Sequence, residues 1–156
     1  MALVGLTTWQ FLLALTVGIL GTMWVVLRPK SSRYQGMIKL GLFLALFDFS
    51  METWGALSGY WFSYQSMAFL GPAPIEVVLM ALMAGATYHL IFPPKMNWAL
   101  GLASSLVIAC IGVIFEAALI GTGSMAYYGG WTSGHALLGY FATFMLVHAA
   151  NEQVTA

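Results

Sequence analysis

Charged residues are scarce in this chain. Only 6% of its 156 residues are Asp, Glu, Lys or Arg, whereas about a quarter of a soluble domain is charged. The formal net charge is zero, so no broad basic surface invites nucleic acid, and we expect no nucleic-acid partner. The hydrophobic share of 61% and the mean hydropathy of +0.88 instead predict a polytopic membrane protein.

Cysteine and the common cofactor motifs are also nearly or wholly absent. Cys110 stands alone, which excludes an internal disulfide and any CxxC metal or redox motif. The first residues carry no Lys or Arg, which argues against a cleaved signal peptide. Phosphate-binding loops, dinucleotide fingerprints and Glu-x-x-His pairs are missing as well. We therefore expect no cofactor and no metal site.

Five apolar stretches each approach the ~20 residues that a membrane-spanning helix needs. The sequence therefore predicts one all-α domain over residues 1–156, a polytopic bundle of five transmembrane helices. The predicted spans cover about residues 8–28, 36–57, 73–92, 97–120 and 132–150. A bundle in which one of these stretches is re-entrant is the alternative.

The basic residues predict how the bundle is oriented. Four of them lie in the first loop and its continuation, residues 28–39, and Lys95 lies in the third loop. These loops share one side of a five-span bundle. Because Lys and Arg favour the cytoplasmic side, we expect the N-terminus outside and the C-terminus inside, in the inner membrane of a prokaryote.

Four of the five acidic residues interrupt or border the apolar stretches. They are Asp48, Glu52, Glu76 and Glu116. A carboxylate in hydrocarbon is costly and normally faces the protein interior or a wet cavity, where it has a function. By helix rise these acids and His135 share the outer half of the bundle, which predicts one site. Structural alternatives stay open: Glu76 as a helix-start residue, Asp48 as a hydrogen-bond partner between helices, and His135 as a solvated residue.

A weak internal repeat links two of these acids. Tyr64 follows Glu52 by twelve residues, and Tyr128 follows Glu116 by twelve residues, each time through a glycine-bearing stretch. The two acids are two spans apart and therefore share an orientation. This pattern indicates that spans two and three form a parallel repeat of spans four and five, an arrangement that often places a site at the repeat interface.

Residues 45–92 resemble the polytopic lycopene-cyclase domain of carotenoid biosynthesis. That family shows an acid, a G-x-W-x-Y-like aromatic run and a P-x-E element that opens the next helix. The matching positions here are Glu52, Gly59, Trp61, Tyr64, Pro74 and Glu76. The stretch FDFSMETWG is also reminiscent of sterol isomerases of the emopamil-binding type, which are small five-span bundles with buried acids.

Both resemblances imply an enzyme that protonates an alkene of an apolar isoprenoid or carotenoid-like lipid, as a cyclase, isomerase or hydratase. They imply Glu76 as the general acid, Glu52 and Glu116 as stabilisers or bases, and Asp48 as support for Glu52. The substrate contacts expected with them are Trp54, Trp61, Tyr64, Tyr128 and His135. The expected partners are this lipid substrate, membrane lipids and further subunits in a homo- or hetero-oligomer. The alternatives are a non-catalytic subunit of a membrane complex and, less favoured, a proton- or ion-translocating protein.

Overall fold

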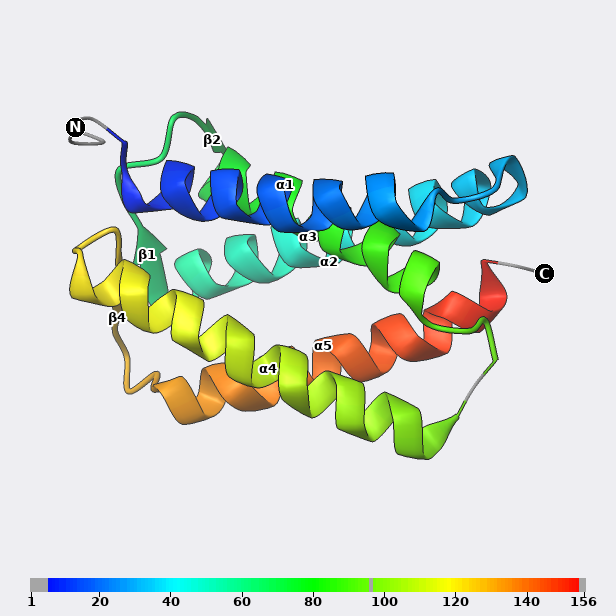
Figure 1. The fold of residues 1–156 in the computed structure, drawn as a ribbon. Helices are drawn as coiled ribbons and strands as arrows, with labels where there is room; N and C mark the ends of the chain where they lie inside the picture. Colours follow the sequence, from blue (N-terminus) through cyan, green and yellow to red (C-terminus); the bar gives the residue numbers. More distant parts are fainter. Residues whose placement is uncertain (1–5, 96, 155–156) are drawn as a thin grey trace.

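Five helices lie alongside one another in the described part of the chain, residues 6–95 and 97–154 of a computed structural model (Figure 1). They are α1 (Thr8–Leu27), α2 (Ser31–Leu57), α3 (Ile75–Ile91), α4 (Trp98–Gly121) and α5 (Ser133–Gln153). Helix makes up 74% of the protein, which confirms the all-α class. In Figure 1, α1 begins at the end of the bundle where strands β1 and β4 lie, and α5 finishes at the opposite end.

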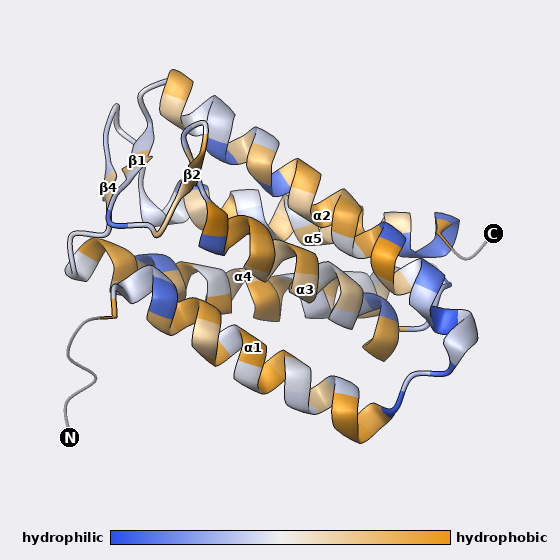
Figure 2. Cartoon of the chain, turned by 90° about the horizontal axis from the view of Figure 1, so that it is seen from above, coloured by the Kyte–Doolittle hydropathy of each residue, from blue (hydrophilic) through white to orange (hydrophobic). Residues whose placement is uncertain are grey.

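Three of these helices are long and apolar enough to cross a membrane: α1, α2 and α4. The helix α3 is apolar but has 17 residues. Figure 2 shows apolar residues along most of the helical lengths, and hydrophilic residues at the connection from α1 to α2 and near the end of α5. These three helices are of the kind that the composition predicts for a membrane protein.

Helix boundaries differ from the predicted spans at three places. The helix α2 starts at Ser31 rather than near 36, because the polar residues after Lys30 are helical although they add nothing to the apolar run. The helix α3 starts at Ile75, since the two residues before it form a strand. The helix α5 continues to Gln153, three residues past the predicted span. Apolar runs locate the part of a helix that suits a membrane, not the helix ends.

Four short strands lie in the connections. The strands β1 (Trp61–Ser63) and β4 (Met125–Tyr127) follow α2 and α4, and they pair antiparallel with Phe62 opposite Ala126. The strands β2 (Phe69–Leu70) and β3 (Ala73–Pro74) form a second antiparallel pair just before α3. The pair β1–β4 joins the connection that follows α2 to the connection that follows α4.

The helices α2 and α4 end in the same way, 64 residues apart in the chain. Ser58 and Thr122 cap them in the right-handed helical conformation. Each cap is followed by a glycine, Gly59 or Gly123, with φ of 70° and 71°. Glycine suits these positions because other residues are strained at positive φ. The two connections therefore leave their helices with the same geometry.

The same spacing of 64 residues holds for the hydrogen bonds beyond the strands. The Tyr64 N–H donates to the Ser124 carbonyl at 2.8 Å, and the Tyr128 N–H donates to the Tyr60 carbonyl at 2.7 Å. Because each connection donates to the other at matching positions, the two bonds are reciprocal. A two-fold axis through the centre of the β1–β4 pair produces this reciprocity.

Hydrogen bonds between buried side chains join α3, α4 and α5 at the other end of the bundle. The Tyr88 hydroxyl lies 2.8 Å from His148 Nδ1 and 3.1 Å from Ser104 Oγ. His89 Nδ1 lies 2.7 Å from Asn151 Oδ1, and the Asn151 amide also donates to two carbonyls just beyond α3. Buried polar groups need such partners, and here they fix the ends of three helices.

Glycines bring α2 and α3 into close contact. A Cβ on Gly85 would lie 2.6 Å from the Leu40 carbonyl oxygen, and one on Gly41 would lie 2.7 Å from the Leu82 carbonyl oxygen. Small residues allow such close approach between the backbones of membrane helices, where close packing drives association.

We expect Gly85→Ala to destabilise the bundle by about 1–3 kcal/mol, because the new methyl group must push two backbones apart. Gly18→Ala is the matched control, since a Cβ on Gly18 in α1 meets nothing within 4 Å. That change should be neutral or stabilising, because alanine favours a helix interior over glycine by about 0.5–1 kcal/mol. Unfolding in detergent by a graded denaturant measures both variants, and equal stabilities would contradict the close-packing interpretation.

Candidate functional site

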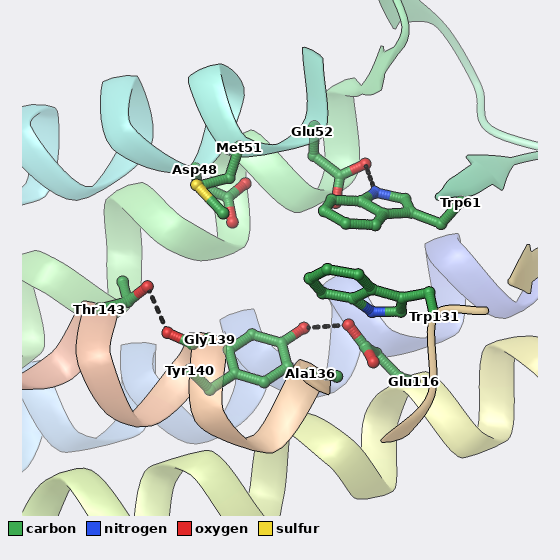
Figure 3. Close-up of a pocket in the computed structure, with 10 residues that line it drawn as sticks. All are labelled: Asp48, Met51, Glu52, Trp61, Glu116, Trp131, Ala136, Gly139, Tyr140 and Thr143. Atoms are coloured by element: carbon green, nitrogen blue, oxygen red, sulfur yellow. Dashed lines mark hydrogen bonds between the residues drawn. The ribbon is translucent and has the colours of Figure 1, made fainter. Parts of the chain in front are cut away.

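A cavity of about 60 Å³ lies between α2 on one side and α4 and α5 on the other (Figure 3). Three acidic residues line it: Asp48 and Glu52 from α2, and Glu116 from α4. The other lining residues are Met51, Trp61, Trp131, Ala136, Gly139, Tyr140 and Thr143. Figure 3 shows the carboxyl groups of Asp48 and Glu52 on one wall, and Glu116 with the Tyr140 ring on the opposite wall.

Glu52 is held by an indole. The Trp61 Nε1–H donates to Glu52 Oε2 at 3.2 Å, and Trp61 itself is buried. The indole fits against α2 because residue 55 is glycine, since a Cβ at that position would overlap the Trp61 ring. Strand β1 thus orients Trp61 so that its N–H reaches the carboxyl group three residues before Gly55.

Glu116 is held by two phenols. The Tyr140 hydroxyl donates to Glu116 Oε1 at 2.8 Å, and the Tyr127 hydroxyl donates to Glu116 Oε2. Burial and the neighbouring Glu116 raise the pKa of Tyr127, so this phenol stays a neutral donor at physiological pH. The Tyr140 ring lies close to α4 at Gly112, where a Cβ would be 2.8 Å from Tyr140 Cδ2. Donors to both oxygens stabilise negative charge on Glu116.

Asp48 differs from the other two acids. Its Oδ2 atom is buried and has no hydrogen-bond partner among the described residues. Buried polar atoms are usually paired, and an unpaired one costs about 1–3 kcal/mol. Because this unpaired oxygen belongs to a residue that lines a cavity with two further acids, Asp48 is a candidate functional residue.

No Lys or Arg of the described chain pairs with these acids. The cavity lining contains no basic side chain. Three carboxyl groups without a cation repel one another when ionised, so a cavity of this kind favours keeping a proton among them. Within the described residues, no three His, Cys, Asp or Glu side chains are grouped so that they could hold a metal ion.

Aromatic side chains close the cavity toward the strands. The ring centroids of Trp61 and Trp131 are 4.8 Å apart. The Trp54 ring lies 5.9 Å from Trp61, and His135 lies 5.3 Å from Trp131. Of the predicted substrate contacts, Trp61 therefore lines the cavity, whereas Trp54 and His135 stand behind its aromatic wall.

The other two predicted substrate contacts lie outside the cavity lining. Tyr64 and Tyr128 are exposed, and their hydroxyl oxygens are 3.3 Å apart. They are 64 residues apart, as are Glu52 and Glu116. This contact between equivalent tyrosines fits the reciprocal backbone bonds of the two connections.

Glu76, predicted as the general acid, does not line the cavity. It is fully buried at the start of α3, and its carboxyl group accepts from the Ser66 hydroxyl and, at 2.8 Å, from the Met67 N–H. Both donors belong to the connection between α2 and α3. The structure therefore gives Glu76 a part in holding this connection, and its catalytic role stays a prediction.

The sequence interpretation missed Tyr140, Trp131 and Thr143 as lining residues, and Tyr127 as a partner of Glu116. A signal was present on α5, where Ala136, Tyr140 and Thr143 follow one another at helical spacing. Small residues on either side of a tyrosine make room for its ring. Tyr127 and Trp131 carried no such signal, because they were indistinguishable from aromatic residues of the membrane interface.

We expect Glu76→Ala to destabilise the protein by about 1–3 kcal/mol, because the fully buried carboxyl group and the two hydrogen bonds that it accepts are lost. Limited proteolysis should then cut faster within residues 64–72. Asp48→Ala is the matched control, since the Oδ2 atom of Asp48 has no partner to lose. A thermal midpoint for Asp48→Ala at or above that of the parent protein, beside a lowered one for Glu76→Ala, is the expected result. The reverse order would contradict both assignments.

Comparisons with known proteins add no relative: no family model, no curated protein and no solved structure matches this chain. The resemblance to the lycopene-cyclase domain therefore stays a prediction from residues 45–92.

Proposed function

We propose that this protein is an integral membrane enzyme that protonates an alkene of an apolar isoprenoid or carotenoid-like lipid. One observation carries the proposal: Asp48, Glu52 and Glu116 line one cavity together with aromatic rings and without a basic residue. A carboxylic acid can donate a proton to a carbon–carbon double bond, and a desolvated site favours its protonated form.

The two walls of the cavity suit different steps. Asp48 and Glu52 on α2 supply the proton, which adds to one alkene carbon and leaves a carbocation at the other. Negative charge on Glu116 stabilises this cation, and Glu116 accepts a proton from a neighbouring carbon. The faces of Trp61 and Trp131 stabilise the cation further. The proton taken up by Glu116 returns to the α2 wall before the next turnover, so the site is restored and no proton is consumed overall. Because the cation loses a proton from its own carbon skeleton, the reaction is an isomerisation or a cyclisation.

The size of the cavity limits what it can enclose. About 60 Å³ is well below the 300–1,000 Å³ of sites that enclose a whole small ligand. The cavity therefore receives the reacting segment of the lipid, while the rest of the chain lies along the apolar surfaces of the bundle. This favours a long substrate that reacts at one end.

We propose further that all five helices cross the membrane, with the N-terminus outside and the C-terminus inside. The lateral arrangement of the helices in Figure 1 supports this topology, because α3 and α5 return along α2 and α4. We also propose that α2–α3 and α4–α5 are parallel repeats, with α1 added. The matched helix ends and the reciprocal bonds between the connections support this. Under this proposal the cavity lies at the interface between the repeats.

Substitution of the cavity acids tests the enzyme. We expect Asp48→Asn, Glu52→Gln and Glu116→Gln each to lower turnover of an isoprenoid or polyene lipid extract by about 10²–10⁴-fold, the usual contribution of a general acid or base. Product formation is followed by liquid chromatography with mass detection, in heavy water, so that the transferred proton appears as deuterium. Glu152→Gln, outside the cavity, is the control and should keep parent activity.

The variant Glu76→Gln distinguishes the cavity from the family-based assignment. The geometry predicts that it keeps turnover, since Glu76 does not line the cavity, whereas the family resemblance predicts that turnover is lost. Unchanged turnover in all three cavity variants would overturn the enzyme proposal. Copurification of a partner whose Lys or Arg crosslinks to Glu52 or Glu116 would favour the alternative, a subunit of a membrane complex.

Labelling of single cysteines tests the topology. In a Cys110→Ser background, we expect a membrane-impermeant maleimide added to intact cells to label Met67→Cys and Thr132→Cys, whose side chains are exposed in the outer connections. Lys95→Cys should be labelled only after the membrane is opened, since the loop between α3 and α4 is inside. Labelling of all three in intact cells would contradict the five-span topology.

A further inference from the structure

A second cavity, separate from the carboxyl site, lies between α1, α2 and α3. It has a volume of about 190 Å³ and an almost wholly apolar lining. The residues that define it are Trp24, Tyr34, Met37, Gly41, Leu82 and Ala86. It shares no lining residue with the carboxyl site, and we call it the apolar groove. It lies near the end of α1 and the start of α2, away from the strands.

The walls of the apolar groove are fixed by direct contacts. The Trp24 Nε1–H donates to Thr87 Oγ1 at 2.8 Å, which ties the last turns of α1 to α3. Gly41 sets the distance between α2 and α3 because a Cβ there would lie 2.7 Å from the Leu82 carbonyl oxygen. The groove is therefore preformed rather than a gap that side chains could close, and preformed sites bind with less ordering cost.

Basic residues surround one end of the apolar groove. The Arg28 N–H donates to the Trp24 carbonyl at 3.0 Å, which places Arg28 one turn beyond the groove wall on α1. Lys30 is the N-cap of α2, and Arg33 directly precedes Tyr34 of the groove. No acidic residue occurs between residues 24 and 47. Positive charge therefore meets the apolar lining at a helix end that lies at the membrane interface.

We propose that the apolar groove binds one anionic phospholipid, with an acyl chain along α1 and α2 and the phosphate at Arg28 and Lys30. Both side chains are exposed and free to reach a headgroup, whereas the Arg33 Nη1–H donates to the Leu90 carbonyl at 2.9 Å. Trp24 and Tyr34 line the groove at the level where aromatic residues favour the headgroup region. The two exposed bases favour an anionic over a zwitterionic headgroup.

Competition between two lipids tests the headgroup. The full chain is purified in detergent, mixed with equal amounts of dioleoylphosphatidylglycerol and dioleoylphosphatidylcholine, and analysed by native mass spectrometry. We expect the phosphatidylglycerol adduct to exceed the phosphatidylcholine adduct by about tenfold or more, since each of the two basic residues near the surface favours an anionic lipid by about fivefold. The double variant Arg28→Gln, Lys30→Gln should bring the two adducts to near equality. Lys95→Gln, in the other loop with a basic residue, should leave the preference unchanged.

A matched pair of tryptophan substitutions tests the groove. Ile38 lines the groove and is 60% exposed, and Leu46 on the same helix is 66% exposed but lines neither cavity. We expect Ile38→Trp to lower the bound phosphatidylglycerol about tenfold without changing the thermal midpoint, whereas Leu46→Trp retains it. The proposal would be overturned if the parent protein bound equal amounts of the two lipids. It would also be overturned if Lys95→Gln reduced the preference for phosphatidylglycerol as much as the double variant Arg28→Gln, Lys30→Gln does. Retention of the lipid by Ile38→Trp would overturn it as well.

Discussion

The antiparallel pairing of β1 with β4 is the contact on which the arrangement of this bundle depends. Each strand follows directly from a helix that carries a buried acid, so their pairing sets how far α2 stands from α4. Trp61, in β1, reaches Glu52, and Tyr127, in β4, reaches Glu116. Three residues in each strand are therefore enough to place two carboxyl groups on opposite walls of one cavity and to give each a donor.

Sequence reasoning located the helices and the acids because both are local features of the chain. A long apolar run and a lone carboxyl group within it are recognised without knowing what packs against them. The partner of an acid depends on how helices face one another, which local sequence does not contain. Tyr140 meets Glu116 across 24 residues of chain. Glu76 shares the depth of the other acids but points into its own connection, because depth along a helix does not define direction around it.

The two walls of the cavity are similar in backbone but different in chemistry. The position 64 residues after Asp48 on α2 is Gly112 on α4. On α2 this position carries Asp48, whose Oδ2 atom has no hydrogen-bond partner among the described residues. On α4 it carries Gly112, and the Tyr140 ring occupies the space beside it. One wall therefore holds an unpartnered acid and the other holds an acid with two donors. Two similar halves can in this way supply opposite roles to a single reaction.

The helix α1 is hydrogen-bonded to both connections, the one after α2 and the one after α4, through the side chain of Trp9. The Trp9 Nε1–H lies 2.9 Å from the Tyr64 carbonyl oxygen and 3.2 Å from the Ser124 carbonyl oxygen, one in each connection. One donor shared between two acceptors is sensitive to the separation of those acceptors. Any motion that parts the two halves must break one of these bonds and change the surroundings of a buried indole. Trp9 thus couples the position of α1 to the separation of the two connections.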